Sequence, residues 1–151
     1  MKLAEALVLR ADAQKRLEQL KQRLLRNAQV QEGDKPAEDP AELLREYEAV
    51  ADELVRLIQR INRTNATARF EGASLTDALA TRDVLRIRAA AYRELASAAS
   101  ITQSRIGRSE VKFRSTVSVS QIQKQADALA REHRELDARI QEANWQLELA
   151  E

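Results

Sequence analysis

Residues 110–119 alternate apolar and polar side chains, and this pattern constrains the fold more than any other segment of the chain. The apolar side chains fall on one side of the segment: Val111, Phe113, Val117 and Val119. A period of two, rich in β-branched and aromatic residues, is typical of a half-buried β-strand. A strand needs a partner, because its unpaired N–H and C=O groups are costly to bury and tend to pair with another chain. No other segment of this length has the pattern, so we expect the strand to pair with a short loop or with a second copy of the chain.

The remainder of the chain predicts four long helices. The 151 residues include three Gly and two Pro, so there are few helix breakers. Apolar residues follow 3,4 spacing in four segments. The first covers residues 2–29, and the second runs from a cap at Asp39 to about Ala68. The third runs from Ser74 to a point between Ser100 and Ile106, and the fourth from residue 118 to the end. Each span is about 35 to 40 Å at 1.5 Å per residue. The sequence therefore predicts one all-α domain, residues 1–151, with four antiparallel helices in a coiled-coil-like bundle and one short strand between the third and fourth.

Local signals fix where these helices begin. Asp39, Pro40 and Glu42 form an N-cap, a first-turn proline and a first-turn acid. Ser74 with Asp77, or Thr76 alone, caps the third helix, and Ser118 with Gln121 caps the fourth. Residues 30–39 are predicted to form a loop, and residues 70–73 a turn flanked by a few extended residues.

The apolar stripes predict which helix faces are buried. In the second helix the main stripe is Leu44, Tyr47, Ala51, Leu54, Ile58, Ile61 and Asn65, and a second strip is Leu43, Val50, Leu57 and Thr64. In the third helix the stripe is Ala80, Val84, Ile87, Ala91, Leu95, Ala98 and Ile101. Trp145 lies off the stripe of the fourth helix, which indicates that a second face is also covered. Several helices thus have more apolar surface than one bundle seam needs.

A group of arginines is the best candidate for a ligand site. Its members are Arg56, Arg60, Arg63, Arg82 and Arg86. Such a group could contact an anion or a nucleic-acid backbone. The chain has few aromatic residues on which bases could stack, and Arg–carboxylate pairing explains the group more simply. Nucleic-acid or anion binding is therefore the alternative function.

The sequence predicts no enzyme and no cofactor. His133, the single histidine, has alanine three residues before it, so the Glu-x-x-His signature of di-iron bundles is absent. No cysteine, glycine-rich phosphate loop or metal-ligand cluster is present. His133 and Asn65 are interpreted as packing and register residues. The alternatives are a metal ligand or pH switch at His133 and a hydrogen-bonding pocket of Asn65 with Arg82 and Asp83.

Charge and the first residues bear on partners and location. Lys plus Arg total 25 against 24 for Asp plus Glu, so bulk charge favours neither nucleic acid nor an anionic membrane. The first residues are amphipathic and unlike a signal peptide, and no apolar run is long enough to span a membrane. We expect a soluble cytoplasmic protein that forms a homo-oligomer, at least a dimer, with residues 110–119 at a subunit contact.

Four phrases of the sequence carry a resemblance that covers nearly the whole chain: RLEQLKQRLLRNAQVQEG, INRTNATARF, SLTDALATRDVLRIR and ALAREHRELDARIQEANW. The chain resembles a family of small bacterial helical proteins that carry the label septicolysin. The resemblance implies an all-helical bacterial protein of unassigned activity, and it implies a tyrosine where this chain has His133. It supplies no catalytic residue, and the sequence does not support the lytic activity that the label suggests.

Overall fold

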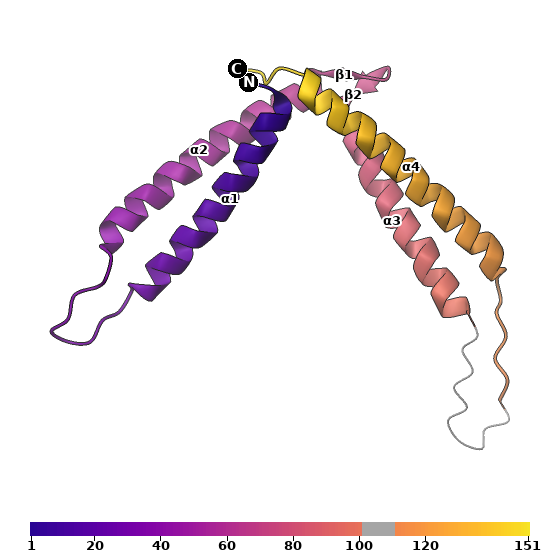
Figure 1. Cartoon of the computed structure of the whole chain (residues 1–151), viewed down its shortest axis with the longest axis horizontal. Helices are drawn as coiled ribbons and strands as arrows, with labels where there is room; N and C mark the ends of the chain where they lie inside the picture. The colour runs from indigo at the N-terminus through magenta and orange to yellow at the C-terminus, as the bar shows by residue number, and fades with distance from the viewer. Residues whose placement is uncertain (101–110) are drawn as a thin grey trace. The chain divides into compact units, whose positions relative to one another are not determined.

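A computed structural model of the chain describes residues 1–100 and 111–151. Within these residues the chain is mostly helical, as the sequence predicts, with α1 (Leu3–Arg26), α2 (Pro40–Thr67), α3 (Leu75–Ala99) and α4 (Val119–Gln146) (Figure 1). Two short strands, β1 (Arg69–Phe70) and β2 (Ala73–Ser74), pair with each other between α2 and α3. The β structure in the described residues thus lies at the turn predicted for residues 70–73.

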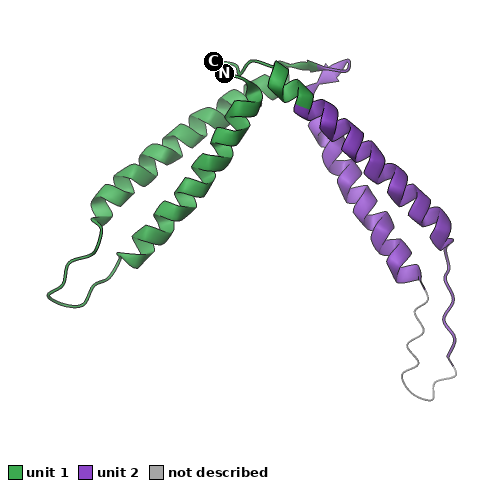
Figure 2. Ribbon diagram, in the orientation of Figure 1, with its two compact units in different colours: residues 1–69, 142–151 green, residues 70–141 purple. Residues whose placement is uncertain are grey.

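The chain divides into two compact units (Figure 2). Unit 1 comprises Met1–Arg69 and Glu142–Glu151, and unit 2 comprises Phe70–Gln141. The prediction of one domain over residues 1–151 stays a prediction.

In unit 1, α1 and α2 form a helical hairpin around a small apolar core. Leu20, Leu43 and Val50 are buried there, with Ala13, Leu17, Leu24 and Tyr47 packed against them. Two ion pairs flank the core: Arg16 Nη2 lies 2.6 Å from Glu46 Oε1, and Arg23 Nε lies 3.1 Å from Glu38 Oε2. The Arg23 guanidinium holds the pKa of Glu38 below its usual value through this hydrogen bond. Contacts of Arg16 with Glu46 and of Arg23 with Glu38 show that the two helices run antiparallel.

The two ends of the chain meet in unit 1. Leu3 N donates to Leu147 O at 2.9 Å, and Leu149 N donates to Met1 O at 2.8 Å. Ala150 N then donates to Thr64 Oγ1 at 2.9 Å. These bonds tie the residues that follow α4 to the start of α1 and to α2.

The predicted helix caps agree with the structure at two helices. Asp39 accepts a hydrogen bond from Ala41 N at 3.0 Å, with Pro40 in the first turn of α2. Ser74 and Asp77 form a capping box at the start of α3. The helix α3 ends at Ala99, just before the predicted range, and Ile101 lies outside the described residues.

The β1–β2 hairpin leads into α3, which lies beside α4 (Figure 1). The turn residues Glu71 and Gly72 both have positive φ, 47° and 87°. Such a two-residue turn suits the twist of a hairpin but strains a non-glycine residue. The carboxylate of Glu71 accepts a 2.6 Å hydrogen bond from Arg139 Nε of α4, which anchors the strained residue.

The strand predicted for residues 110–119 is wrong in the described part of this segment. No strand is assigned over residues 111–118, and Val119 begins α4; Glu110 lies outside the described residues. The alternating pattern is local, whereas a strand also requires a hydrogen-bonded neighbouring strand, so the pattern by itself does not make one.

The predicted faces of two helices differ from the structure. In α2 the second strip is buried together with Ile61 of the main stripe, whereas Leu44 is exposed and the other residues of the main stripe are half-buried. Asn65 is only half-buried, and its neighbour Thr64 is the buried polar residue. In α3 the buried residues are Leu75, Ala78, Leu85, Ala89 and Ala96, none of which belongs to the predicted stripe. In α1 and α4 the apolar residues with the predicted 3,4 spacing include buried side chains: Leu3, Ala6 and Leu20 in α1, and Ala126, Leu129, Leu136 and Ile140 in α4.

Candidate functional site

The most prominent surface feature is an exposed apolar stripe on α3. Every described member of the stripe predicted from the sequence is exposed: Ala80, Val84, Ile87, Ala91, Leu95 and Ala98. Ile87, at its centre, is 66% exposed. The stripe keeps the 4,3 spacing of a helix-packing face, while the opposite side of α3 makes the core of unit 2. We call these six residues the α3 stripe.

A second apolar surface lies in unit 1. Met1, Val8, Leu9 and Trp145 line a groove of about 520 Å³, together with Glu5. Trp145 is 60% exposed, so the face on which it lies is open in this chain. We call this surface the Trp145 groove. The sequence indicated a second face at Trp145 but did not bring it together with Val8 and Leu9.

The predicted oligomer contact contains one very exposed aromatic residue. Phe113 is 80% exposed, and Val111 is exposed as well. Val117 and Val119 are half-buried. The role of these residues in a subunit contact stays a prediction.

The predicted arginine residues fall into both units, and some already have partners. Arg60 Nε donates to Ala150 O at 2.8 Å. Arg82 lies 3.2 Å from Asp83 and 3.1 Å from Asp137, and Arg86 lies 3.5 Å from Asp83. Arg56 and Arg63 are exposed and form no ion pair with a described residue. Three of the five side chains thus have structural contacts that account for them.

The contact of Arg60 gives a prediction about stability. We expect Arg60→Ala to lower the free energy of unfolding by about 1.5–3 kcal/mol, because a charge-assisted hydrogen bond to Ala150 O is lost. Arg63→Ala, at an exposed position on the same helix, should change it by no more than about 0.5 kcal/mol. Urea unfolding followed by circular dichroism measures both. Equal effects for the two variants would contradict a structural role for Arg60.

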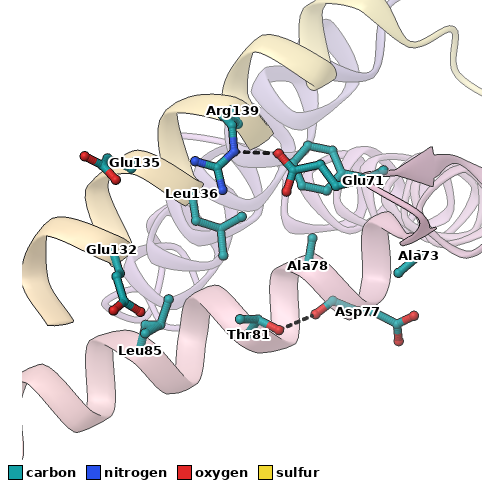
Figure 3. Close-up of a pocket in the computed structure, with 11 residues that line it drawn as sticks. Glu71, Ala73, Asp77, Ala78, Thr81, Leu85, Glu132, Glu135, Leu136 and Arg139 are labelled. Atoms are coloured by element: carbon teal, nitrogen blue, oxygen red, sulfur yellow. Dashed lines mark hydrogen bonds and ion pairs between the residues drawn. The ribbon is translucent and has the colours of Figure 1, made fainter.

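A hollow of about 350 Å³ lies in unit 2 between the β hairpin, α3 and α4 (Figure 3). Its carboxylates are mostly engaged: Glu71 with Arg139, Asp77 in the helix cap, and Glu135 with Arg131 at 2.9 Å. The Arg131 guanidinium keeps the pKa of Glu135 below its usual value. Glu132 lines the same hollow without an ion pair to a described residue. Its other walls include apolar or small side chains, such as Leu85, Leu136 and Ala78.

Residues 1–100 and 111–151 contain no cluster of three His, Cys, Asp or Glu side chains that could hold a metal ion. His133 is half-buried on α4, and no hydrogen bond joins it to another residue in this part of the chain. None of the helices described combines the length and apolar character needed to cross a membrane.

Comparisons with known proteins support the helical fold and assign no activity. No curated protein matches this sequence. The crystal structure of a functionally unknown conserved protein from Corynebacterium diphtheriae is similar, with 47% identity and a TM-score of 0.94 over 99% of this chain and 98% of that one. These matches do not bear on the septicolysin-like resemblance, which stays a prediction. The model of the family of unknown function DUF6847 matches residues 10–149, so the chain belongs to this family.

Proposed function

We propose that this protein acts by binding other copies of itself, as a non-enzymatic homo-oligomeric scaffold, at least a dimer, in the cytoplasm. The observation that carries the proposal is the α3 stripe. Six residues of one helix face are apolar and exposed, although another face of the same helix already makes the core of its unit. Burying a side chain such as Ile87 gains about 1.5–3 kcal/mol, so this face favours contact with a further helix.

The spacing of the stripe suits helix-to-helix packing between copies. Alanines at positions 80, 91 and 98 let a neighbouring helix approach closely, and the larger Val84, Ile87 and Leu95 supply the apolar contact. We propose that the coiled-coil-like packing predicted from the sequence forms here between copies. Two identical stripes related by a two-fold axis would bury each other.

Molar mass measured by light scattering tests this proposal. Over a micromolar concentration series, we expect a mass of at least two chains. A mass of one chain at every concentration contradicts self-association.

Nucleic-acid or anion binding is the rival function, and a gel-shift experiment separates it from the proposal. We expect no shift of single-stranded or duplex RNA at about 50 mM salt, where phosphate contacts bind most strongly. The informative variant is Arg56→Glu combined with Arg63→Glu, because neither side chain has an ion pair in the described structure. A shift by the parent that weakens with salt and is lost in this variant would favour the rival.

A further inference from the structure

The segment around Phe113 combines an exposed aromatic ring with two cations. Phe113 is 80% exposed, more than any other large apolar side chain in the described residues. Lys112 and Arg114 on either side are also exposed, and neither forms an ion pair within the part of the chain that the structure describes. An aromatic side chain in this setting is typical of residues that anchor protein interfaces.

The Trp145 groove has the complementary character. Its apolar lining comes from Met1, Val8, Leu9 and Trp145, and Glu5 lies at its edge. Asp12 lies one turn beyond Val8 on α1, and Glu142 lies one turn before Trp145 on α4. None of these three carboxylates forms an ion pair with a described residue, although Glu5 Oε2 accepts a 2.7 Å hydrogen bond from Lys2 N and Glu142 Oε1 accepts one of 3.4 Å from Gln146. The ammonium group of Met1, which also lines the groove, lies 3.3 Å from Glu148. The groove is therefore apolar at its centre and acidic at its edge.

We propose that Phe113 of one copy docks in the Trp145 groove of a second copy, with Lys112 and Arg114 facing the carboxylates of Glu5, Asp12 and Glu142. This inference rests on the proposed self-association and adds a contact distinct from the α3 stripe. Aromatic pairs such as Phe with Trp gain stability beyond the area that they bury, and charge complementarity fixes the register of the segment. The volume of the groove, about 520 Å³, lies within the range of about 300–1,000 Å³ that holds small ligands.

Tryptophan fluorescence tests this contact directly, because Trp145 is the single tryptophan of the chain. As the concentration rises through the range in which light scattering shows assembly, the emission of the parent should shift to shorter wavelength. Quenching of that emission by acrylamide should fall severalfold. In the Phe113→Ser variant, the emission wavelength and the quenching by acrylamide should remain those of an exposed tryptophan at every concentration. Val55→Ser, which removes an exposed apolar side chain elsewhere, should behave like the parent.

A mixing experiment shows whether the contact joins two copies. A Trp145→Ser variant emits no tryptophan fluorescence but keeps Phe113. Added to the Phe113→Ser variant, it should restore the shift to shorter wavelength, because its Phe113 fills the groove of the other copy.

Each result has a definite consequence. If Phe113→Ser keeps the parent's shift, or if mixing does not restore it, the docking contact is wrong. If the parent assembles while Trp145 stays accessible to acrylamide, the docking contact is also wrong, but self-association stands. A mass of one chain at every concentration contradicts both.

Discussion

Replacing Leu20 with alanine is expected to destabilise the α1–α2 hairpin by about 2–5 kcal/mol. Leu20 is 1% exposed and lies in the apolar core with Leu43 and Val50. Truncation removes apolar contacts and leaves a cavity, because the two helices cannot close fully over the missing atoms. This loss is a large fraction of the net stability of a typical folded domain, about 5–15 kcal/mol.

Leu25→Ala is the matched control, since Leu25 lies on the same helix and is 61% exposed. It removes the same atoms from a position in solvent, so its effect should stay within about 0.5 kcal/mol. Urea titrations of both variants, followed by far-ultraviolet circular dichroism, give the two free energies. A loss for Leu25→Ala as large as that for Leu20→Ala would mean that the core face of α1 has been misassigned.

The positions of the helices could be predicted from the sequence because their signals are local. Asp39 followed by Pro40 begins α2, and Ser74 with Asp77 begins α3. An N-cap acts through hydrogen bonds within a few residues, so it needs no knowledge of the rest of the fold. The turn at residues 70–73 was predictable for the same reason, since Gly72 permits the positive φ of 87°.

The buried faces of α2 and α3 could not be predicted, because each helix has apolar residues on two sides. In α2 the strip with Leu43 and Val50 and the stripe with Leu44 and Leu54 both have helical spacing. In α3, Leu85 is buried and Ile87 is exposed although both are large and apolar. Periodicity shows that a face is apolar, but which neighbour covers it is decided by tertiary packing.

The candidate surfaces were only partly predictable. Trp145 is recognisable as an off-stripe residue, but the groove requires α1 residues far away in sequence, Val8 and Leu9. The arginines were predicted as a group, yet Arg60 and Arg82 have partners, Ala150 and Asp137, that lie distant in the chain. Sequence spacing does not show such long-range contacts.

Replacing Ile87 with glutamate is expected to dissociate the proposed oligomer. Ile87 lies at the centre of the α3 stripe and is 66% exposed within one chain. A carboxylate at this position costs the single chain little, because it stays in water. Between two stripes it would be an unpaired buried charge, which costs about 3–5 kcal/mol. The association constant should therefore fall by about two to four orders of magnitude.

Ser97→Glu is the matched control for this substitution. Ser97 is exposed on α3 and lies outside the stripe, so the variant adds the same charge to the same helix on a different side. Light scattering over a concentration series should give the parent's mass for Ser97→Glu and a lower mass at each concentration for Ile87→Glu. Circular dichroism of all three proteins should agree, which shows that the helices are intact.

The pair of variants also decides where the copies meet. If both lower the mass equally, added charge on α3 is the cause and the stripe has no special role. If neither lowers the mass of an oligomeric parent, the copies meet through another surface, of which the Trp145 groove is the next to test. Loss of mass in Ile87→Glu alone, with unchanged helix content, requires that the exposed face of α3 is buried between copies.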